Sequence, residues 1–78
     1  MSALNDLIVD ENNIAFHPMM GNSYQLNEIS NDIVALLKQS KSKAEIIEAL
    51  AQDYEVSKEE LFIDVSDFLS KLKVYGLV

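Results

Sequence analysis

Short runs of hydrophobic residues separated by polar, turn-prone residues predict β-strands within residues 6–26. The clearest alternation is at Tyr24 and Leu26, which a period of two places on one face of a strand. The segment 18–22 contains Pro, Gly and Asn and has the composition of a hairpin loop. The three predicted strands cover residues 7–9, 13–17 and 23–26.

From residue 27 onward, hydrophobic residues recur every three or four positions, which predicts amphipathic α-helices at about residues 28–39, 43–54 and 58–75. Asn27 can cap the first helix, and two Ser-x-x-Glu sequences that begin at Ser42 and Ser57 have the capping-box pattern. Gly76 follows the last helix, where a left-handed residue ends helices well. The hydrophobic face expected of the last helix consists of Leu61, Val65, Phe68, Leu69, Leu72 and Tyr75.

A single shared core is the arrangement expected for a small sheet and three amphipathic helices. The chain has 78 residues, of which 49% are hydrophobic, so residues 1–78 are expected to form one domain. A β-hairpin joined to a helix-turn-helix is a winged helix. The sequence therefore predicts a small α+β winged-helix domain, with a three-stranded antiparallel sheet followed by three helices.

The composition excludes several kinds of chemistry. The chain has no cysteine and one histidine, which argues against thiolate sites, multi-histidine metal sites and histidine-paired catalysis. His17 is interpreted as a surface or half-buried turn residue, because no nucleophile or orienting carboxylate is fixed near it in sequence. Asp64 and Asp67 share a helix face but lack further oxygen ligands. No enzyme activity, metal or cofactor is therefore expected.

The charge of the chain argues against binding to nucleic acid or an anionic membrane. Thirteen acidic residues outnumber six lysines, and the net charge is −7. A winged-helix DNA-binding regulator remains an alternative, although the chain has no arginine and its last helix is net negative. A second alternative is a small adaptor protein that dimerises through Ile63 and Val74. The N-terminal hydrophobic run is too short for a signal peptide, so a cytoplasmic location is expected.

An open sheet of three strands leaves backbone groups unpaired at its edges. The third predicted strand carries no charge, which suits a strand that pairs with a guest peptide. The sequence leaves open whether this strand is at the edge, central, or covered by a helix. If it is at the edge, one margin of the last helix, with Asp64, Phe68 and Lys71 and with Asp67 further round, would form a groove beside it.

The segment 17–27 reads His-Pro-Met-Met-Gly-Asn-Ser-Tyr-Gln-Leu-Asn and resembles the D-P-x-x-G-x-x-Y-x-L-N signature of PqqD-like proteins. The likeness continues at residues 43–47, in the last helix at 64–65 and 68–72, and at the terminal 76–78. It covers roughly residues 7–78. The chain departs from the family where His17 replaces the usual Asp, and where the first helix has Ile33 and Val34 but no tryptophan.

The resemblance implies a non-catalytic function. PqqD-like proteins are winged-helix peptide chaperones that bind the leader of a ribosomally made precursor peptide by strand addition. They present it to a modifying enzyme, such as a radical S-adenosylmethionine enzyme. The expected partners are therefore a leader peptide and a peptide-modifying enzyme. The implied binding residues are Ser23, Tyr24 and Gln25 for strand pairing, and Asp64, Asp67, Phe68 and Lys71 for contacts in the groove.

Overall fold

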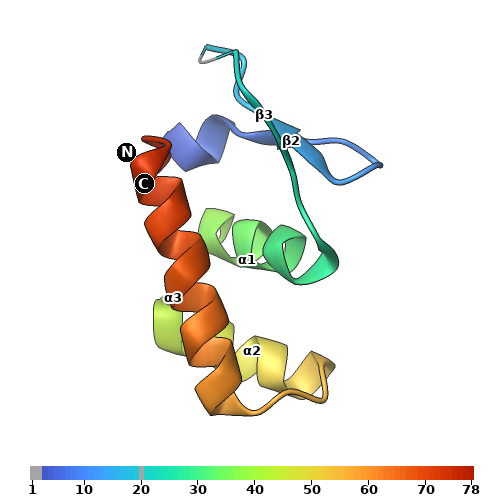
Figure 1. The fold of residues 1–78 in the computed structure, drawn as a ribbon, viewed down its shortest axis with the longest axis vertical. Helices are drawn as coiled ribbons and strands as arrows, with labels where there is room; N and C mark the ends of the chain where they lie inside the picture. Colours follow the sequence, from blue (N-terminus) through green and yellow to red (C-terminus); the bar gives the residue numbers. More distant parts are fainter. Residues whose placement is uncertain (1–2, 20) are drawn as a thin grey trace.

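A three-stranded sheet precedes three helices in the computed structural model, which describes residues 3–19 and 21–78 (Figure 1). This confirms the predicted α+β fold. Met20 of the predicted hairpin loop and residues 1–2 of the predicted domain lie outside the described residues. The strands are β1 (Ile8–Val9), β2 (Ile14–Phe16) and β3 (Ser23–Gln25), and the helices are α1 (Glu28–Lys38), α2 (Lys43–Asp53) and α3 (Lys58–Val74).

The sheet is antiparallel and has the order β1-β2-β3, so β2 is the central strand. Ala15 of β2 pairs with Val9 on one side and Tyr24 on the other. Because side chains alternate between the two faces of a strand, Ala15 is fully buried while Phe16 is exposed on the outer face. Each strand is shorter than predicted by one or two residues at its ends.

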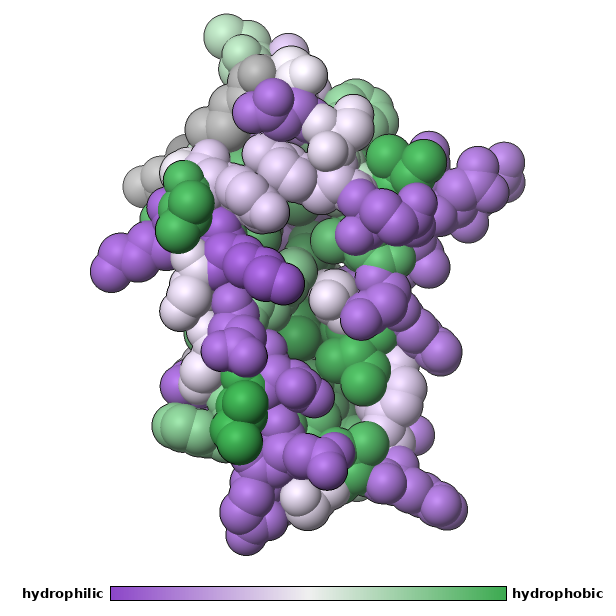
Figure 2. All heavy atoms as spheres, in the orientation of Figure 1, coloured by the Kyte–Doolittle hydropathy of each residue, from purple (hydrophilic) through white to green (hydrophobic). Residues whose placement is uncertain are grey.

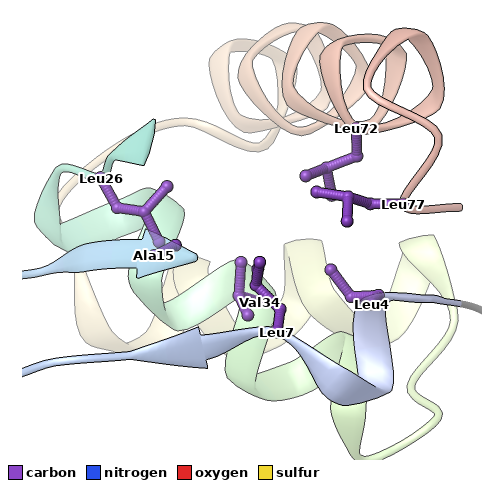
Figure 3. Close-up of a cluster of buried hydrophobic side chains, with 7 residues drawn as sticks. All are labelled: Leu4, Leu7, Ala15, Leu26, Val34, Leu72 and Leu77. Atoms are coloured by element: carbon purple, nitrogen blue, oxygen red, sulfur yellow. The ribbon is translucent and has the colours of Figure 1, made fainter. Parts of the chain in front are cut away.

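The buried side chains form two clusters that meet at α1. The first lies between the sheet, α1 and the end of α3 (Figure 3), and consists of Leu4, Leu7, Ala15, Leu26, Val34, Leu72 and Leu77. The second joins the three helices and consists of Ile33, Ile46, Leu50, Leu61 and Val65. Adjacent residues of α1, Ile33 and Val34, face different clusters. Helix α1 therefore connects the sheet half of the molecule to the helical half.

The helix ends agree closely with the predicted caps. The Asn27 side chain accepts a hydrogen bond from the Ser30 backbone N at 2.8 Å, and Ser42 forms the expected capping box at the start of α2. Ser57 accepts from the Glu60 backbone N at 3.2 Å. Among the described residues, the reciprocal bond that would complete a second capping box is absent. Helix α3 thus begins with a simple serine cap.

The two ends of the described chain lie side by side (Figure 1). Gly76 has a φ of 78°, as expected for a residue that ends a helix, and this turns Leu77 back onto the core. A 3-10 helix, η1 (Ala3–Asp6), was not predicted; the Leu4 backbone N within it donates to the Leu77 carbonyl at 2.9 Å. Val78, the next residue, is 47% exposed.

His17 is buried, with an exposed fraction of 4%, so the expectation of a surface or half-buried residue was wrong. It lies two positions after Ala15, and the alternation of the strand carries it to the same inner face. Its Nδ1 accepts a hydrogen bond from the Met19 backbone N at 3.1 Å. His17 therefore has a structural role in shaping the turn that leads into β3.

In the described part of the chain, three long-range side-chain hydrogen bonds tie α1 to its neighbours, and one of them runs from Asn31 Nδ2 to Asn13 Oδ1 at 2.9 Å. Lys38 Nζ, at the end of α1, donates to the Leu7 carbonyl beside β1. Near the middle of α1, Asp32 Oδ2 accepts a hydrogen bond from the Tyr54 hydroxyl at 2.5 Å, which joins the end of α2 to α1. This bond, followed by burial, raises the pKa of Tyr54. Tyr54 is the C-cap of α2, so the helix ends one residue earlier than predicted.

Within residues 3–19 and 21–78, no helix is long and apolar enough to cross a membrane. The same residues contain no group of three or more His, Cys, Asp or Glu side chains that could hold a metal ion.

Candidate binding groove

Strand β3 is at the edge of the sheet, which resolves the alternatives that the sequence left open. The Leu26 backbone N donates to the Asn13 carbonyl at 2.8 Å, so the backbone N–H of Leu26 points toward the β2 side of the ladder. In an antiparallel ladder, residues whose backbone groups point toward the paired strand alternate with residues whose backbone groups point outward. By this alternation the backbone N–H and C=O groups of Tyr24 point toward β2. Those of Ser23 and Gln25 point to the open edge of the sheet.

The opposite edge of the sheet offers a guest strand much less. Strand β1 has only two residues, Ile8 and Val9, and acidic residues, Asp6 and Asp10, lie close to both of its ends. The segment 22–27, which contains β3, carries no charged side chain. Charges and short length are two ways in which proteins protect sheet edges from pairing. Strand β3 has neither a charge nor a covering strand among the described residues.

Two adjoining hollows lie along α3, one against the first turns of α1 and the other against β3. The first has a volume of about 260 Å³ and is lined by Asn27, Ile29, Ser30, Ile33, Asp64, Asp67, Phe68 and Lys71. The second has a volume of about 350 Å³ and is lined by Tyr24, Gln25, Leu26, Asn27, Ser30, Phe68, Lys71 and Tyr75. Because the hollows share Asn27, Ser30, Phe68 and Lys71, they form one depression, here called the β3–α3 groove. Figure 2 shows hydrophobic surface in a depression between hydrophilic margins on one face of the molecule.

Phe68 is the central hydrophobic residue of the groove. It is partly buried and packs against both core clusters, and its side chain lines both hollows. A ring held in this way presents a fixed apolar surface, which loses little conformational entropy when a ligand binds. The groove therefore has a rigid apolar centre.

An aromatic pair closes one end of the groove. The rings of Tyr24 and Tyr75 stack with a centroid distance of 4.5 Å and an interplanar angle of 24°. Tyr75 is 44% exposed, so its expected place on the buried face of the last helix was wrong. It follows α3 as the C-cap, where its ring reaches across to the inner face of β3 instead.

The charged residues of the groove are separated along α3. Asp64 and Asp67 line only the first hollow, whereas Lys71 lines both. All three are exposed, and none forms an ion pair with another described residue; the pair found in this part of the chain is Lys58–Glu48, at 2.8 Å. The groove thus has an acidic end near the start of α1 and a basic residue toward the tyrosine pair.

The structure brings together six of the seven residues predicted for the site, at the walls of the groove. Ser23 lies on β3 beyond the hollows and faces the open edge with its backbone. Gln25 also contributes through its backbone, because its side-chain Nε2 donates to the carbonyls of Asn12 and Asn13 at 3.2 and 3.4 Å. Peptide binding by these residues stays a prediction.

The first turn of α1 was not predicted to take part in binding. Asn27 and Ser30 line both hollows, and Ile29 and Ile33 line the first. One signal was available: Asn27 caps a helix that follows β3 with almost no loop, so its first turn must lie next to the edge strand. Tyr75 was missed because helical spacing alone placed it on the buried face.

Ile63 and Val74, which the adaptor hypothesis uses, are exposed by 58% and 84% and do not line either hollow. Dimerisation through them stays a prediction.

Comparison with known proteins finds one matching family and similar solved structures for this chain. The family model described as Coenzyme PQQ synthesis protein D (PqqD) matches residues 9–78. No curated protein matches the chain. Similar solved structures include one titled "Lasso peptide synthetase B1 complexed with the leader peptide", with a TM-score of 0.79 and 24% identity over 91% of this chain and 85% of that one. Another is "TbiB1 in Complex with the TbiA(beta) Leader Peptide", with a TM-score of 0.80 and 25% identity over 91% and 84%.

Proposed function

The chain belongs to the PqqD family, and on that premise we propose that it captures the leader of a ribosomally synthesised precursor peptide and presents it to a modifying enzyme. The observation that carries this proposal is the open, uncharged edge of β3 beside the β3–α3 groove. A leader in extended conformation adds to this edge as a fourth strand. The two similar structures are complexes with leader peptides by their titles, which supports the same class of ligand here.

Strand pairing and side-chain contacts have separate roles in this mode of binding. Ser23 and Gln25 offer four outward backbone groups, and four hydrogen bonds contribute roughly 2–6 kcal/mol at about 0.5–1.5 kcal/mol each. Ordering a flexible peptide costs about 2–5 kcal/mol. Backbone pairing alone therefore leaves little net affinity. The required surplus comes from side chains of the leader that enter the groove.

The groove supplies those contacts from both walls. Phe68 is the apolar anchor, with Tyr24 at the sheet side, and Asp64, Asp67 and Lys71 contribute charge along α3. The first turn of α1 adds polar groups through Asn27 and Ser30. Together these features favour an extended peptide with at least one apolar side chain.

The contribution to maturation is a matter of effective concentration and requires no catalysis by this chain. A leader held by the β3–α3 groove keeps the attached core peptide close to the modifying enzyme. Tethering of this kind produces effective concentrations up to the millimolar range for short flexible linkers. The partner is an enzyme that modifies the core peptide.

The test replaces one edge residue in two ways and measures binding of a fluorescent synthetic peptide. A short precursor gene is first sought in the reading frames that neighbour the gene of this chain, and the peptide covers the leader that it encodes. Gln25→Pro removes the outward N–H and restricts the strand backbone. We expect its affinity to fall by about tenfold or more, because one hydrogen bond is lost and the edge is distorted.

Gln25→Ala is the matched control for this experiment. It removes the side-chain hydrogen bonds to Asn12 and Asn13 but keeps the backbone N–H. We expect it to bind the peptide nearly as well as the wild-type chain. Circular dichroism verifies that both variants are folded. A folded Gln25→Pro variant with wild-type affinity would rule out strand addition at β3.

A further inference from the structure

We propose that the β3–α3 groove selects its peptide by charge order. A Lys or Arg side chain of the peptide lies beside Asp64 and Asp67, two positions before an apolar side chain that contacts Phe68. This inference rests on the proposed function, since it names the kind of peptide that the same groove accepts. It follows from the relative direction of β3 and α3, the spacing along α3, and the unpaired charges.

The residues at each end of the groove show how the directions of β3 and α3 are related. At one end, Tyr24 stacks on Tyr75, near the beginning of β3 and just after the end of α3. At the other end, Asn27 lines the same hollow as Asp64. Strand β3 and helix α3 therefore run in opposite directions along the groove.

A guest strand takes its direction from β3. Antiparallel pairing is slightly more stable per residue than parallel pairing. A guest that is antiparallel to β3 runs in the same direction as α3. Its earlier residues then lie near Asp64, and its later residues lie near Lys71 and Tyr75.

The residue spacing along one turn of α3 matches the spacing of same-face residues along a guest strand. Asp64 and Phe68 are four residues apart, which is about 6 Å along a helix axis. Two residues of a strand span about 6.8 Å, and residues two apart point to the same face. A guest side chain opposite Asp64 is therefore followed, two positions later on the same face, by one opposite Phe68.

The charged residues of the groove determine which charge a guest side chain should carry at each position of this register. Asp64 and Asp67 are exposed carboxylates that form no ion pair within the described residues, so a cationic guest side chain can pair with both. Lys71, one turn beyond Asp67, repels a cation placed further along the guest. A site that attracts at one position and repels at another discriminates against shifted registers.

The experiment selects binders from a display library of random 12-residue peptides against the folded full chain. For the wild-type chain we expect enrichment of Lys or Arg two positions before an aromatic or aliphatic residue. The double variant Asp64→Lys, Asp67→Lys is selected in parallel and should lose that enrichment. We expect wild-type binders to bind this variant on the order of tenfold more weakly, because two exposed attractive pairs become repulsive.

A matched control separates the local effect from the change in net charge. Asp53→Lys, Glu55→Lys changes the net charge by the same amount at exposed residues that do not line the groove. This control should retain the wild-type selection. Binders without the basic enrichment, with the basic residue after the apolar one, or unaffected by the groove variant would overturn the charge order and leave the proposed function standing. Failure of the wild-type chain to select any peptide would overturn both.

Discussion

Glu45 and Ser42 hold the start of α2 through two reciprocal hydrogen bonds. The Ser42 backbone N donates to Glu45 Oε1 at 2.8 Å, and the Glu45 backbone N donates to Ser42 Oγ at 3.2 Å. The first of these bonds favours the ionised carboxylate. It is the main reason why the pKa of Glu45 is lowered below its ordinary value.

This lowered pKa gives a pH-dependent prediction. A group whose folded pKa lies below its unfolded value, about 4.3 for Glu, contributes stability above that value and loses it as the pH falls through the folded pKa. Glu45→Ala should therefore be less stable than the wild-type chain at neutral pH, and the difference should shrink below about pH 4. Urea unfolding at both pH values measures it. Glu55→Ala, which removes an exposed acid that caps no helix, is the control for the loss of one negative charge.

The burial of His17 was not predicted from the sequence, whereas the helix caps were. Caps such as Ser42 were predictable because donor and acceptor are three residues apart. His17 is buried because it lies on the same inner face as Ala15, and its Nδ1 finds its donor, the Met19 N–H, only in the turn after β2. Neighbouring sequence showed a polar ring beside Pro18 and therefore favoured the surface.

At the scale of elements, the helices were predictable and the role of β3 was not. Each helix combines a hydrophobic stripe with a cap, and both signals are local. Strand order is non-local: the sequence showed that β3 is uncharged, but only the pairing of β2 with both neighbours places it at the edge. The seven site residues came from the family resemblance and from the margin of α3. The contribution of α1 required knowledge of how its first turn approaches α3.

Phe68 belongs to both a core and a groove, so its two contributions need separate variants. Phe68→Ala removes packing from both clusters and should destabilise the fold by about 2 kcal/mol, since the ring is only partly buried. Phe68→Leu keeps most of the apolar volume and should cost less than about 1.5 kcal/mol. Thermal unfolding measures both effects.

Peptide binding then distinguishes the groove role of Phe68 from its core role. Phe68→Leu should weaken binding clearly while the domain stays folded, because the flat ring that lines both hollows is lost. Equal affinity of this variant and the wild-type chain would show that the ring serves the core alone.

At the scale of the whole molecule, Leu77 joins the two ends of the chain to the sheet. It is fully buried in the cluster that contains Leu4, Ala15 and Leu72. Its backbone N donates to the Leu72 carbonyl, and its carbonyl accepts from the Leu4 backbone N, both at 2.9 Å. A domain this small has a thin margin of stability, so one such residue has a large share in it.

Leu77→Ala should therefore destabilise the domain by about 2–5 kcal/mol, the range for a buried leucine. In a domain of this size each kcal/mol lowers the melting temperature by roughly 4–8 °C. Val78→Ala, at the adjacent half-exposed residue, should stay within about 0.5 kcal/mol of the wild-type value. Hydrogen exchange should show faster exchange of the Leu26 amide in the Leu77 variant, because Leu26 lies in the same cluster and pairs β3 to β2. Equal stability of the two variants would mean that the sheet is held without the C-terminal residues, and that the open edge of β3 is stable independently of them.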